Sequence, residues 1–223
     1  MKTNKLTFGK FYHIYNRGTN SCNLFNETTN YEHFLRLYDK YISPIADTFA
    51  WVLMKNHFHL LIKIKEENCI DFIEQNTERS ERHFRVPPDI ISTTQPFKTS
   101  ALNQKKFDPT LQFSHLFNAY SKAFNKKYER TGSLFEHPFK RIEITDNNYL
   151  HYLVHYIHHN PVHHGFCKHM VEYPWSSYLT ILSPKQTRLK RDEVLKWFNN
   201  TNNFKEYHNN AGLIKEFSFL HID

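Results

Sequence analysis

The sequence predicts an α+β fold built on an antiparallel sheet of four strands. Two patterns indicate it: short runs rich in aromatic and β-branched residues, typical of strands, and longer runs with apolar side chains at helical spacing. The predicted elements follow one another in the order strand, helix, strand, strand, helix, strand, and one more helix comes after the last strand. The chain has 223 residues, of which 39% are hydrophobic, enough for the core of one domain with an appendage.

The first half of the chain provides three of the expected strands. Residues 8–15 are aromatic and β-branched and run into an Asn-Arg-Gly turn signal. Asn30 is expected to cap a helix that extends to about residue 41, ahead of a proline. Residues 48–54 and 57–65 have strand character, and the two residues between them predict a hairpin.

The spacing of apolar residues that is typical of strands and helices is lost after the third strand and returns in the second half of the chain. Residues 69–75 are expected to form a short helix. The segment from about 77 to 109 has no periodicity and several prolines, which predicts a long loop or a partly disordered insertion. Residues 111–128 have helical spacing, and 134–144 form the fourth expected strand, which Pro138 places at a sheet edge or a bulge.

One further helix closes the predicted domain. Asp146 is a good N-cap for a helix over residues 147–159, which Pro161 is expected to end. The order of elements is that of a split βαβ, or ferredoxin-like, sheet with this helix added. We therefore divide the chain into a domain of residues 1–166 and a small helical appendage, residues 167–223, that packs on it.

Composition argues against several functional classes. Glycine is scarce, with 5 residues, and no Gly-rich phosphate-binding motif occurs, so no nucleotide cofactor is expected. The three cysteines, Cys22, Cys69 and Cys167, are odd in number and far apart, which suits a reducing cytoplasm and not a disulfide framework. No stretch resembles a signal peptide or a membrane span, so we expect a cytoplasmic protein without a membrane partner.

The chain is basic, with a net charge of +7, and its positive residues are unevenly spread. Residues 105–141 contain eight Lys or Arg against three acidic residues. Aromatic side chains interleave with them, at Phe117, Tyr120, Phe124 and Tyr128. This combination is typical of nucleic-acid binding, where cations contact phosphates and rings stack on bases. A solvated helix face with its own buried aromatic stripe explains the pattern equally well.

A pair of histidines marks the candidate site. His57 and His59 are two residues apart on an expected strand, so their side chains point to one face, while Phe58 points to the other. Two imidazoles one strand repeat apart are close enough to bind one metal ion. By itself the spacing is a weak signal, because a chain with 16 histidines can produce it by chance.

Tyr156 and Asn160 add a nucleophile and a further ligand, one turn apart on the expected last helix. A metal held by two imidazoles and the Asn160 amide keeps positions open for a phosphodiester. A tyrosine beside it can attack phosphorus and form a covalent phosphotyrosine without ATP, provided that the metal or a base helps a phenol that titrates near ~10. The alternatives are that Tyr156 is a packing residue, that Tyr152 is the nucleophile, and that Asn160 caps its helix.

Five segments of the chain occur in the order found in one known family. The sequence resembles the single-tyrosine HUH transposases, and in particular the REP-associated tyrosine transposase group. The resemblance is carried by YHIYNRG at residues 12–18, WVLMKNHFHLLIK at 51–63, RTGSLFEHPFKR at 130–141, YLVHYIHHNPVHHG at 152–165 and YPWSSY at 173–178. Together these segments run across most of the chain from residue 8 to residue 178.

The resemblance implies a ferredoxin-like HUH nuclease fold that cleaves and rejoins single-stranded DNA next to hairpins. It implies a divalent ion, Mg²⁺ or Mn²⁺, bound by His57 and His59. The family's nucleophile lies in the motif Tyr-Ile-x-x-Asn-Pro, which makes Tyr156 the nucleophile that holds the 5′ phosphate and Asn160 the third metal ligand. The chain departs from the family in its longer insertion and in the histidines of residues 158–164. Their spacing matches no standard zinc pattern and predicts a solvated or DNA-facing cluster.

Six basic residues are candidates for contacts with DNA phosphates, and any one of them except Lys63 could be an ordinary surface charge. Lys63 shares the histidine face and is the one expected nearest the scissile phosphate. The candidates are Arg17, Lys63, Lys126, Lys127, Lys140 and Arg141. We expect single-stranded or hairpin DNA as the partner of a monomer or a homodimer that associates with the nucleoid. Three other functions stay open: a domesticated hairpin-binding protein that does not cleave, a metal-dependent nuclease that uses water, and a structural DNA-associated protein.

Overall fold

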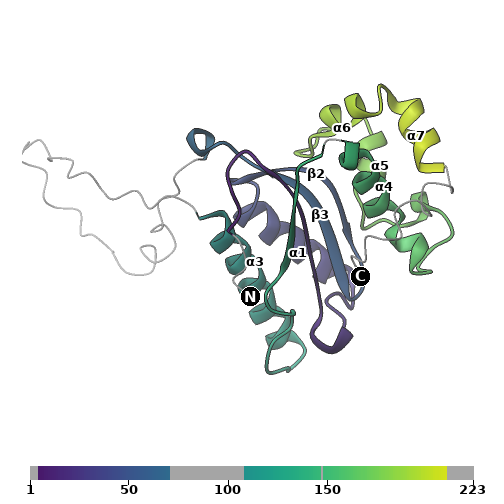
Figure 1. The fold of residues 1–223 in the computed structure, drawn as a ribbon. Helices are drawn as coiled ribbons and strands as arrows, with labels where there is room; N and C mark the ends of the chain where they lie inside the picture. Colours follow the sequence, from purple (N-terminus) through teal and green to yellow (C-terminus); the bar gives the residue numbers. More distant parts are fainter. Residues whose placement is uncertain (1–4, 71–107, 147, 210–223) are drawn as a thin grey trace, which may run out of the picture.

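The computed structural model describes residues 5–70, 108–146 and 148–209 (Figure 1). The insertion predicted at 77–109 and the short helix predicted at 69–75 lie almost wholly outside the described residues. Within the described part, no helix combines the length and the apolar character that crossing a lipid bilayer requires.

The centre of the fold is a four-stranded antiparallel sheet with the strand order β2-β3-β1-β4. β2 and β3 form the predicted hairpin, and β1 lies between β3 and β4. The strands are β1 (Phe11–Arg17), β2 (Ala46–Leu53), β3 (His57–Ile64) and β4 (Lys140–Ile144). The predicted ferredoxin-like α+β class, with one helix after the fourth strand, is confirmed.

Helices cover both faces of this sheet (Figure 1). On β3, Phe58 and Leu60 belong to the core shared with two helices on one face, whereas Leu61 belongs to the core shared with the helix on the other face. The histidine face of β3 is therefore an interior surface along most of its length. The first two helices are α1 (Thr28–Tyr41) and α3 (Pro109–Lys127), and the helix on the other face is α4 (Asn148–His163).

Helix α1 begins earlier than predicted, because Asn30 is not its N-cap. Glu27 occupies that position, and its side chain accepts a hydrogen bond from the backbone of Asn30. Asn30 Oδ1 accepts in return from the N–H of Glu27, at 3.3 Å. The two residues form a capping box in which each satisfies a backbone donor of the other. Asn30 therefore stabilises the helix start from inside the first turn.

Helix α4 continues through Pro161, so the prediction that this proline ends the helix is wrong. The helix ends at His163, and Gly165, two residues later, has a φ of +71°. The N–H of Phe166 donates to the carbonyl of Pro161 at 2.8 Å, and the N–H of Gly165 donates to that of Val162 at 3.0 Å. These two bonds are the Schellman arrangement, which favours glycine in the left-handed region. Asn160 is thus an interior residue of α4 and not a helix cap.

The fourth strand is shorter than predicted. Residues 134–139 contribute one isolated bridge, between Phe135 and Gly18, and regular pairing with β1 starts at Lys140. Pro138 has no N–H to donate to a ladder, so the continuous strand begins after it.

The C-terminal segment covers the edge of β2 and the outer side of α4. The N–H of Leu53 donates to Trp175 O, and the N–H of Ser177 donates to Trp51 O, both at 2.9 Å. These bonds occupy edge groups that would otherwise be open to another chain. Phe204, in this segment, is fully buried in the core that also contains the apolar side chains of α4. The short elements are η1 (Thr19–Ser21), η2 (Glu67–Cys69), η3 (Met170–Glu172), α5 (Tyr178–Leu182), α6 (Arg191–Trp197) and α7 (Thr201–Asn209).

Candidate functional site

The predicted metal ligands meet where β3 begins and α4 ends. The ring centroids of His57 and His59 lie 5.2 Å apart. Asn160 Oδ1 lies 3.4 Å from His57 Nε2, although the two residues are 103 positions apart in the chain. The fold therefore brings two imidazoles and an amide together as the sequence predicts.

Each imidazole is held by a neutral partner at its Nδ1 atom. His57 Nδ1 lies 2.8 Å from Asn56 Oδ1. His59 Nδ1 lies 3.0 Å from His13 Nε2. By contrast, His59 Nε2 and Asn160 Nδ2 are buried and have no hydrogen-bond partner among the described residues. A buried polar atom without a partner costs free energy, so the Nε2 of His59 marks the place where a ligand would bind.

The donor set at this place suits a divalent cation. Two imidazole nitrogens and one amide oxygen are acceptable ligands for Mn²⁺ and, less favourably, for Mg²⁺. Within the part of the chain that the structure describes, no three His, Cys, Asp or Glu side chains gather closely enough to hold a metal. A metal here would therefore depend on the Asn160 amide, with water or a substrate completing its coordination.

Burial keeps two histidines of the site, His13 and His59, neutral. It lowers the pKa of His13 to about 3. It also lowers the pKa of His59 well below the ordinary value, and the charges of His13, His57 and His164 act in the same direction. A neutral imidazole presents a lone pair at pH 7, as a metal ligand must.

Tyr156 lies beside the histidine pair, one turn before Asn160 on α4. Its ring is edge-on to that of His59, with centroids 5.4 Å apart, and 6.0 Å from that of His13. The side chain of Tyr156 is half-buried, whereas Tyr152, the rival nucleophile, is 6% exposed. The more accessible phenol beside the histidines makes Tyr156 the better candidate.

A cavity of about 420 Å³ opens onto the two histidines. Arg17 and Lys140 line it from neighbouring strands. Arg17 Nε forms an ion pair with Glu136 Oε1 at 2.7 Å. Tyr15 stacks on His59, with ring centroids 5.6 Å apart. The cavity thus combines cations that can attract a phosphate with an aromatic ring beside the candidate metal ligands.

Lys63 does not lie beside the histidine pair, so that expectation is wrong. It shares their face of β3 but is four residues beyond His59, roughly 13 Å along the strand at the usual rise. There its ammonium lies 4.0 Å from Glu66 Oε1 and 5.7 Å from the centre of the Phe11 ring. The intervening Leu61 is covered by α4.

Three other predicted phosphate contacts lie on the far side of the sheet. Lys126 and Lys127 are in the last turn of α3, where Lys127 pairs with Glu27. Arg141 follows Lys140 on β4 and so points to the opposite face, where its guanidinium lies 4.3 Å from the centre of the Phe139 ring. The structure therefore places Arg17 and Lys140, of the six candidates, at the histidine cavity.

The histidines of residues 158–164 do not form one solvated cluster. His158 is 0% exposed and bonds to Ser177 and His208. His163 is exposed, and His164, also exposed, reaches the cavity, with its ring centroid 4.9 Å from that of His57. The helical turn separates these side chains onto different faces of α4, so the predicted common cluster is wrong for His158.

The fold is similar to that of a solved structure. One solved structure is described as the REP-associated tyrosine transposase bound to a REP hairpin, and the match has a TM-score of 0.55 at 16% sequence identity. It covers 82% of this chain and 85% of that chain. This protein has the fold of that transposase. No family model and no curated protein matches the sequence.

Four residues that contact the histidine pair were not predicted from the sequence to do so. His13, Tyr15, Asn56 and His164 all contact the histidine pair, but they come from three separate segments. Asn56 had a local signal, because it precedes His57 directly. His13 and Tyr15 are recognisable only once strand pairing brings β1 beside β3, and His164 only once α4 packs against β3.

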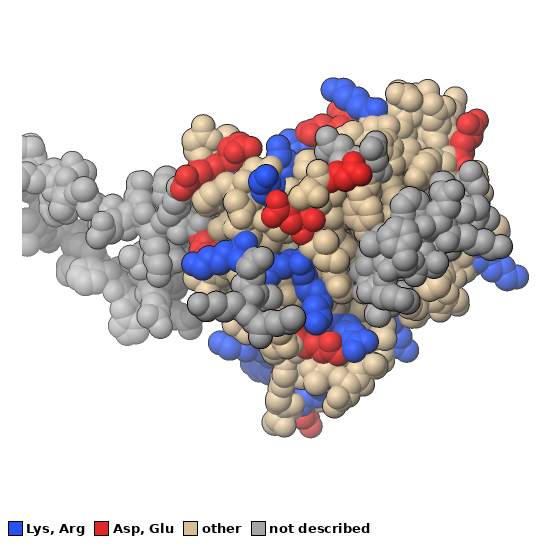
Figure 2. Space-filling view, viewed as in Figure 1, with Lys and Arg blue, Asp and Glu red and all other residues tan. Residues whose placement is uncertain are grey.

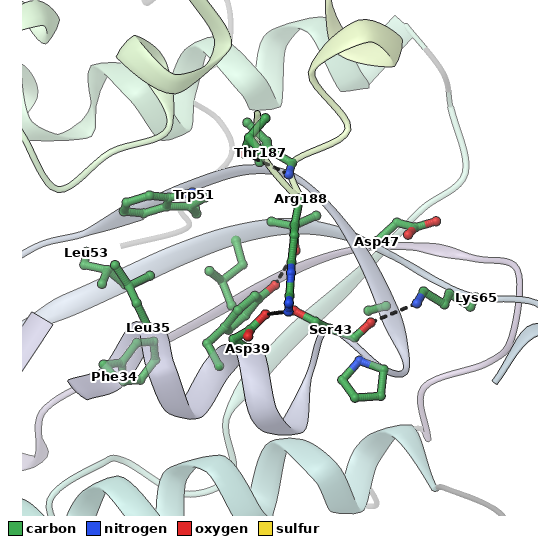
Figure 3. A pocket seen from close by; sticks show the side chains of 16 residues that line it. Phe34, Leu35, Asp39, Ser43, Asp47, Trp51, Leu53, Lys65, Thr187 and Arg188 are labelled. Carbon is green, nitrogen blue, oxygen red and sulfur yellow. Dashed lines mark hydrogen bonds and ion pairs between the residues drawn. The ribbon is translucent and has the colours of Figure 1, made fainter. Parts of the chain in front are cut away.

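A second cavity, of about 700 Å³, is larger but lies elsewhere (Figure 3). It is between α1, β2 and residues 187–189, and none of the predicted site residues lines it. Figure 3 shows Arg188 extending across it to form an ion pair with Asp39.

Figure 2 shows Lys and Arg side chains across the middle of one face of the molecule, with Asp and Glu side chains among them. That face is therefore of mixed charge and not uniformly basic.

Proposed function

We propose that this protein cleaves and rejoins single-stranded DNA beside hairpins through a covalent 5′-phosphotyrosine on Tyr156. The observation that carries the proposal is the meeting of Tyr156 and Asn160 with the histidine pair, which lines a cavity. The buried Nε2 of His59 has no partner there among the described residues. The shared fold supports it, because the solved transposase is bound to a REP hairpin.

The side chains of this protein have distinct roles in the proposed reaction. Arg17 and Lys140 attract the DNA backbone to the cavity. The phenol oxygen of Tyr156 bonds to phosphorus while the bond from phosphorus to the 3′ oxygen breaks. The phenol proton passes to solvent, and the departing 3′ oxygen takes up a proton and becomes a hydroxyl. Rejoining is the reverse reaction and needs no ATP, since the phosphotyrosine retains the energy of the broken bond.

His57, His59 and Asn160 would hold a divalent ion, Mg²⁺ or Mn²⁺. When bound, the ion supplies positive charge and Lewis acidity at the scissile phosphate. The three ligands are all neutral, and the imidazoles favour Mn²⁺ over Mg²⁺ by their softness. The cytoplasmic location, the choice between monomer and homodimer, and the division at residue 166 stay predictions.

The proposal is tested with end-labelled single-stranded oligonucleotides that carry a hairpin, incubated with the protein and Mn²⁺ or Mg²⁺. We expect a protein–DNA adduct that survives denaturation. The adduct is expected to disappear in Tyr156→Phe, which removes the nucleophile, and in His57→Ala, which removes a ligand. Tyr152→Phe is the matched control, because it removes a neighbouring phenol from the same helix and should leave the adduct in place.

Other outcomes identify other functions. Cleavage that persists in Tyr156→Phe without an adduct would mean that water is the nucleophile. Binding of the hairpins without cleavage in either metal would indicate a domesticated binding protein. An adduct that disappears in Tyr152→Phe but not in Tyr156→Phe would transfer the nucleophile to the other tyrosine.

A further inference from the structure

His13 lies directly behind His59, on the neighbouring strand. It is two residues before Tyr15, which pairs with His59 across the sheet. Its side chain is 0% exposed, and its Nε2 lies 3.0 Å from His59 Nδ1. The two rings are nearly parallel, with centroids 5.2 Å apart and planes at 22°. His13 therefore contacts the nitrogen of His59 opposite to the unpartnered Nε2.

We propose that His13 is a positioning residue: it accepts a hydrogen bond from His59 Nδ1–H and so directs the lone pair of His59 Nε2 into the metal site. The inference rests on the proposed function, because it concerns the same site. It assigns His13 no contact with metal or DNA.

Two arrangements of hydrogen are possible when His13 and His59 are both neutral. In one, His59 Nδ1–H donates to His13 Nε2, and His59 Nε2 carries a lone pair. In the other, His13 Nε2–H donates to His59 Nδ1, and His59 Nε2 carries a buried hydrogen without an acceptor among the described residues. A metal can bind only in the first arrangement. Without a metal, each arrangement leaves one buried N–H without an acceptor among the described residues, at His13 Nδ1 in the first and at His59 Nε2 in the second. Ligation satisfies His59 Nε2 only in the first arrangement, which a bound metal therefore favours.

The use of a histidine here has an electrostatic consequence. Metal-binding histidines commonly donate their second N–H to a carboxylate, a carbonyl or water. At this site the acceptors at Nδ1 are the Asn56 amide and the His13 imidazole, both neutral. Neither adds negative charge beside the ligands. The positive charge of a bound ion is therefore available to the DNA phosphate, at the expense of affinity for the ion alone.

Two measurements on the full chain test the inference. Long-range ¹H–¹⁵N correlation spectra of the metal-free protein report the tautomer of each histidine, and the spectrum of His59→Gln identifies the His59 signals. Titration with Mn²⁺, followed by the electron paramagnetic resonance of the free ion, gives the affinity. His13→Phe keeps a ring that can stack on Tyr15 but has no acceptor, and His13→Gln restores an acceptor near the position of Nε2.

We expect His59 of the wild type to carry its hydrogen on Nδ1. His13→Phe should lose this preference and bind Mn²⁺ about 10- to 100-fold more weakly, and His13→Gln should recover most of the affinity. A merely structural role would not produce rescue by Gln together with a change of tautomer. If His13→Phe fails to fold, by circular dichroism, His13→Leu replaces it and the comparison with His13→Gln stands.

The inference is overturned if His59 of the wild type carries its hydrogen on Nε2, or if the acceptor-free variant binds Mn²⁺ as tightly as the wild type. Absence of Mn²⁺ binding by the wild type would also overturn it, together with the metal site. A failed adduct assay with normal tautomer and Mn²⁺ results would count against the covalent chemistry alone. The two proposals can therefore fail separately.

Discussion

His158 on α4 and His208 on α7 form a buried hydrogen bond, with 2.9 Å between His158 Nδ1 and His208 Nε2. Burial lowers the pKa of both side chains, that of His208 to about 3, so both are neutral at pH 7. His208 Nδ1 donates to the carbonyl oxygen of Phe204 at 2.7 Å, because a carbonyl can only accept. His208 Nε2 must then be the acceptor and His158 Nδ1–H the donor.

The hydrogen bonds continue from His158 to the sheet. With its hydrogen on Nδ1, His158 accepts at Nε2 from the hydroxyl of Ser177, at 2.8 Å. Ser177 Oγ in turn accepts from the N–H of Trp51 on β2, at 2.9 Å. Hydrogen bonds thus run in one direction from the edge strand through α4 to α7. They hold the helix that carries Tyr156 and Asn160 against the sheet.

Replacing His208 with leucine is expected to lower the free energy of unfolding by about 1–3 kcal/mol, because it leaves a buried polar group of His158 unpaired in either tautomer. Urea denaturation followed by circular dichroism measures the change. His163→Leu is the control, since His163 is an exposed histidine near the end of α4, and its replacement should change stability by less than about 0.5 kcal/mol. Equal effects of the two substitutions would show that the hydrogen bond between His158 and His208 adds nothing to the free energy of unfolding.

Acid is expected to destabilise the protein well above the pH at which its carboxylates titrate. Burial lowers the pKa of His155 to about 4 and that of His208 to about 3. Because the folded-state pKa lies below the unfolded value of about 6.5, the unfolded state binds more protons between the two, and acid favours unfolding. The stability is complete above about pH 7 and is lost progressively toward pH 3. Urea midpoints between about pH 7 and pH 4 measure the loss.

His155→Phe should make that pH dependence shallower, because it removes one buried group that must take up a proton on unfolding. The exposed His163→Phe is the matched control and should leave the slope unchanged. A wild-type midpoint that stays constant down to pH 5 would contradict the assignment of these histidines as buried and neutral.

Alternation along β3 was sufficient to place His57 and His59 on one face, since a strand fixes the direction of successive side chains. It could not show that α4 buries that face, because this depends on contacts between segments about 100 residues apart, such as that between His57 and Asn160. His13 was missed for the same reason. Its place behind His59 follows from the pairing of β1 with β3, which are not consecutive strands.

The local geometry of strands and helices is sufficient to correct two of the predictions, those for Arg141 and for the end of α4. Lys140 and Arg141 are neighbours on a strand, so alternation alone implies that they do not face one site. Gly165, just beyond the end of α4, is visible in the sequence, and a proline within the last turn of a helix loses one hydrogen bond without stopping the helix. The separation of Lys126 from the cavity depends on which sheet face α3 covers, and the sequence does not encode this in any local pattern.

Mn²⁺ is expected to raise the thermal unfolding temperature of the wild type through binding to the folded state. At a free concentration of 100 times Kd the stabilisation is about 2.7 kcal/mol. His59→Leu should abolish the increment, whatever its own starting stability, because it removes the nitrogen that has no other partner in the described part of the chain. Lys63→Leu, on the same face of β3 but away from the site, should retain it. An increment that survives in His59→Leu would place the metal elsewhere.

Lys140→Gln is expected to weaken binding of hairpin DNA and to make it less sensitive to salt, because Lys140 lines the cavity that contains the histidine pair. Each lost phosphate contact should reduce the slope of log K against log salt by about 0.7–0.9. Lys126→Gln removes the same charge from α3, on the opposite face of the sheet, and should leave the slope unchanged. Fluorescence anisotropy at several salt concentrations measures both. If the two variants lose the same slope, the DNA responds to the overall positive charge of the protein, and Lys140 has no specific contact.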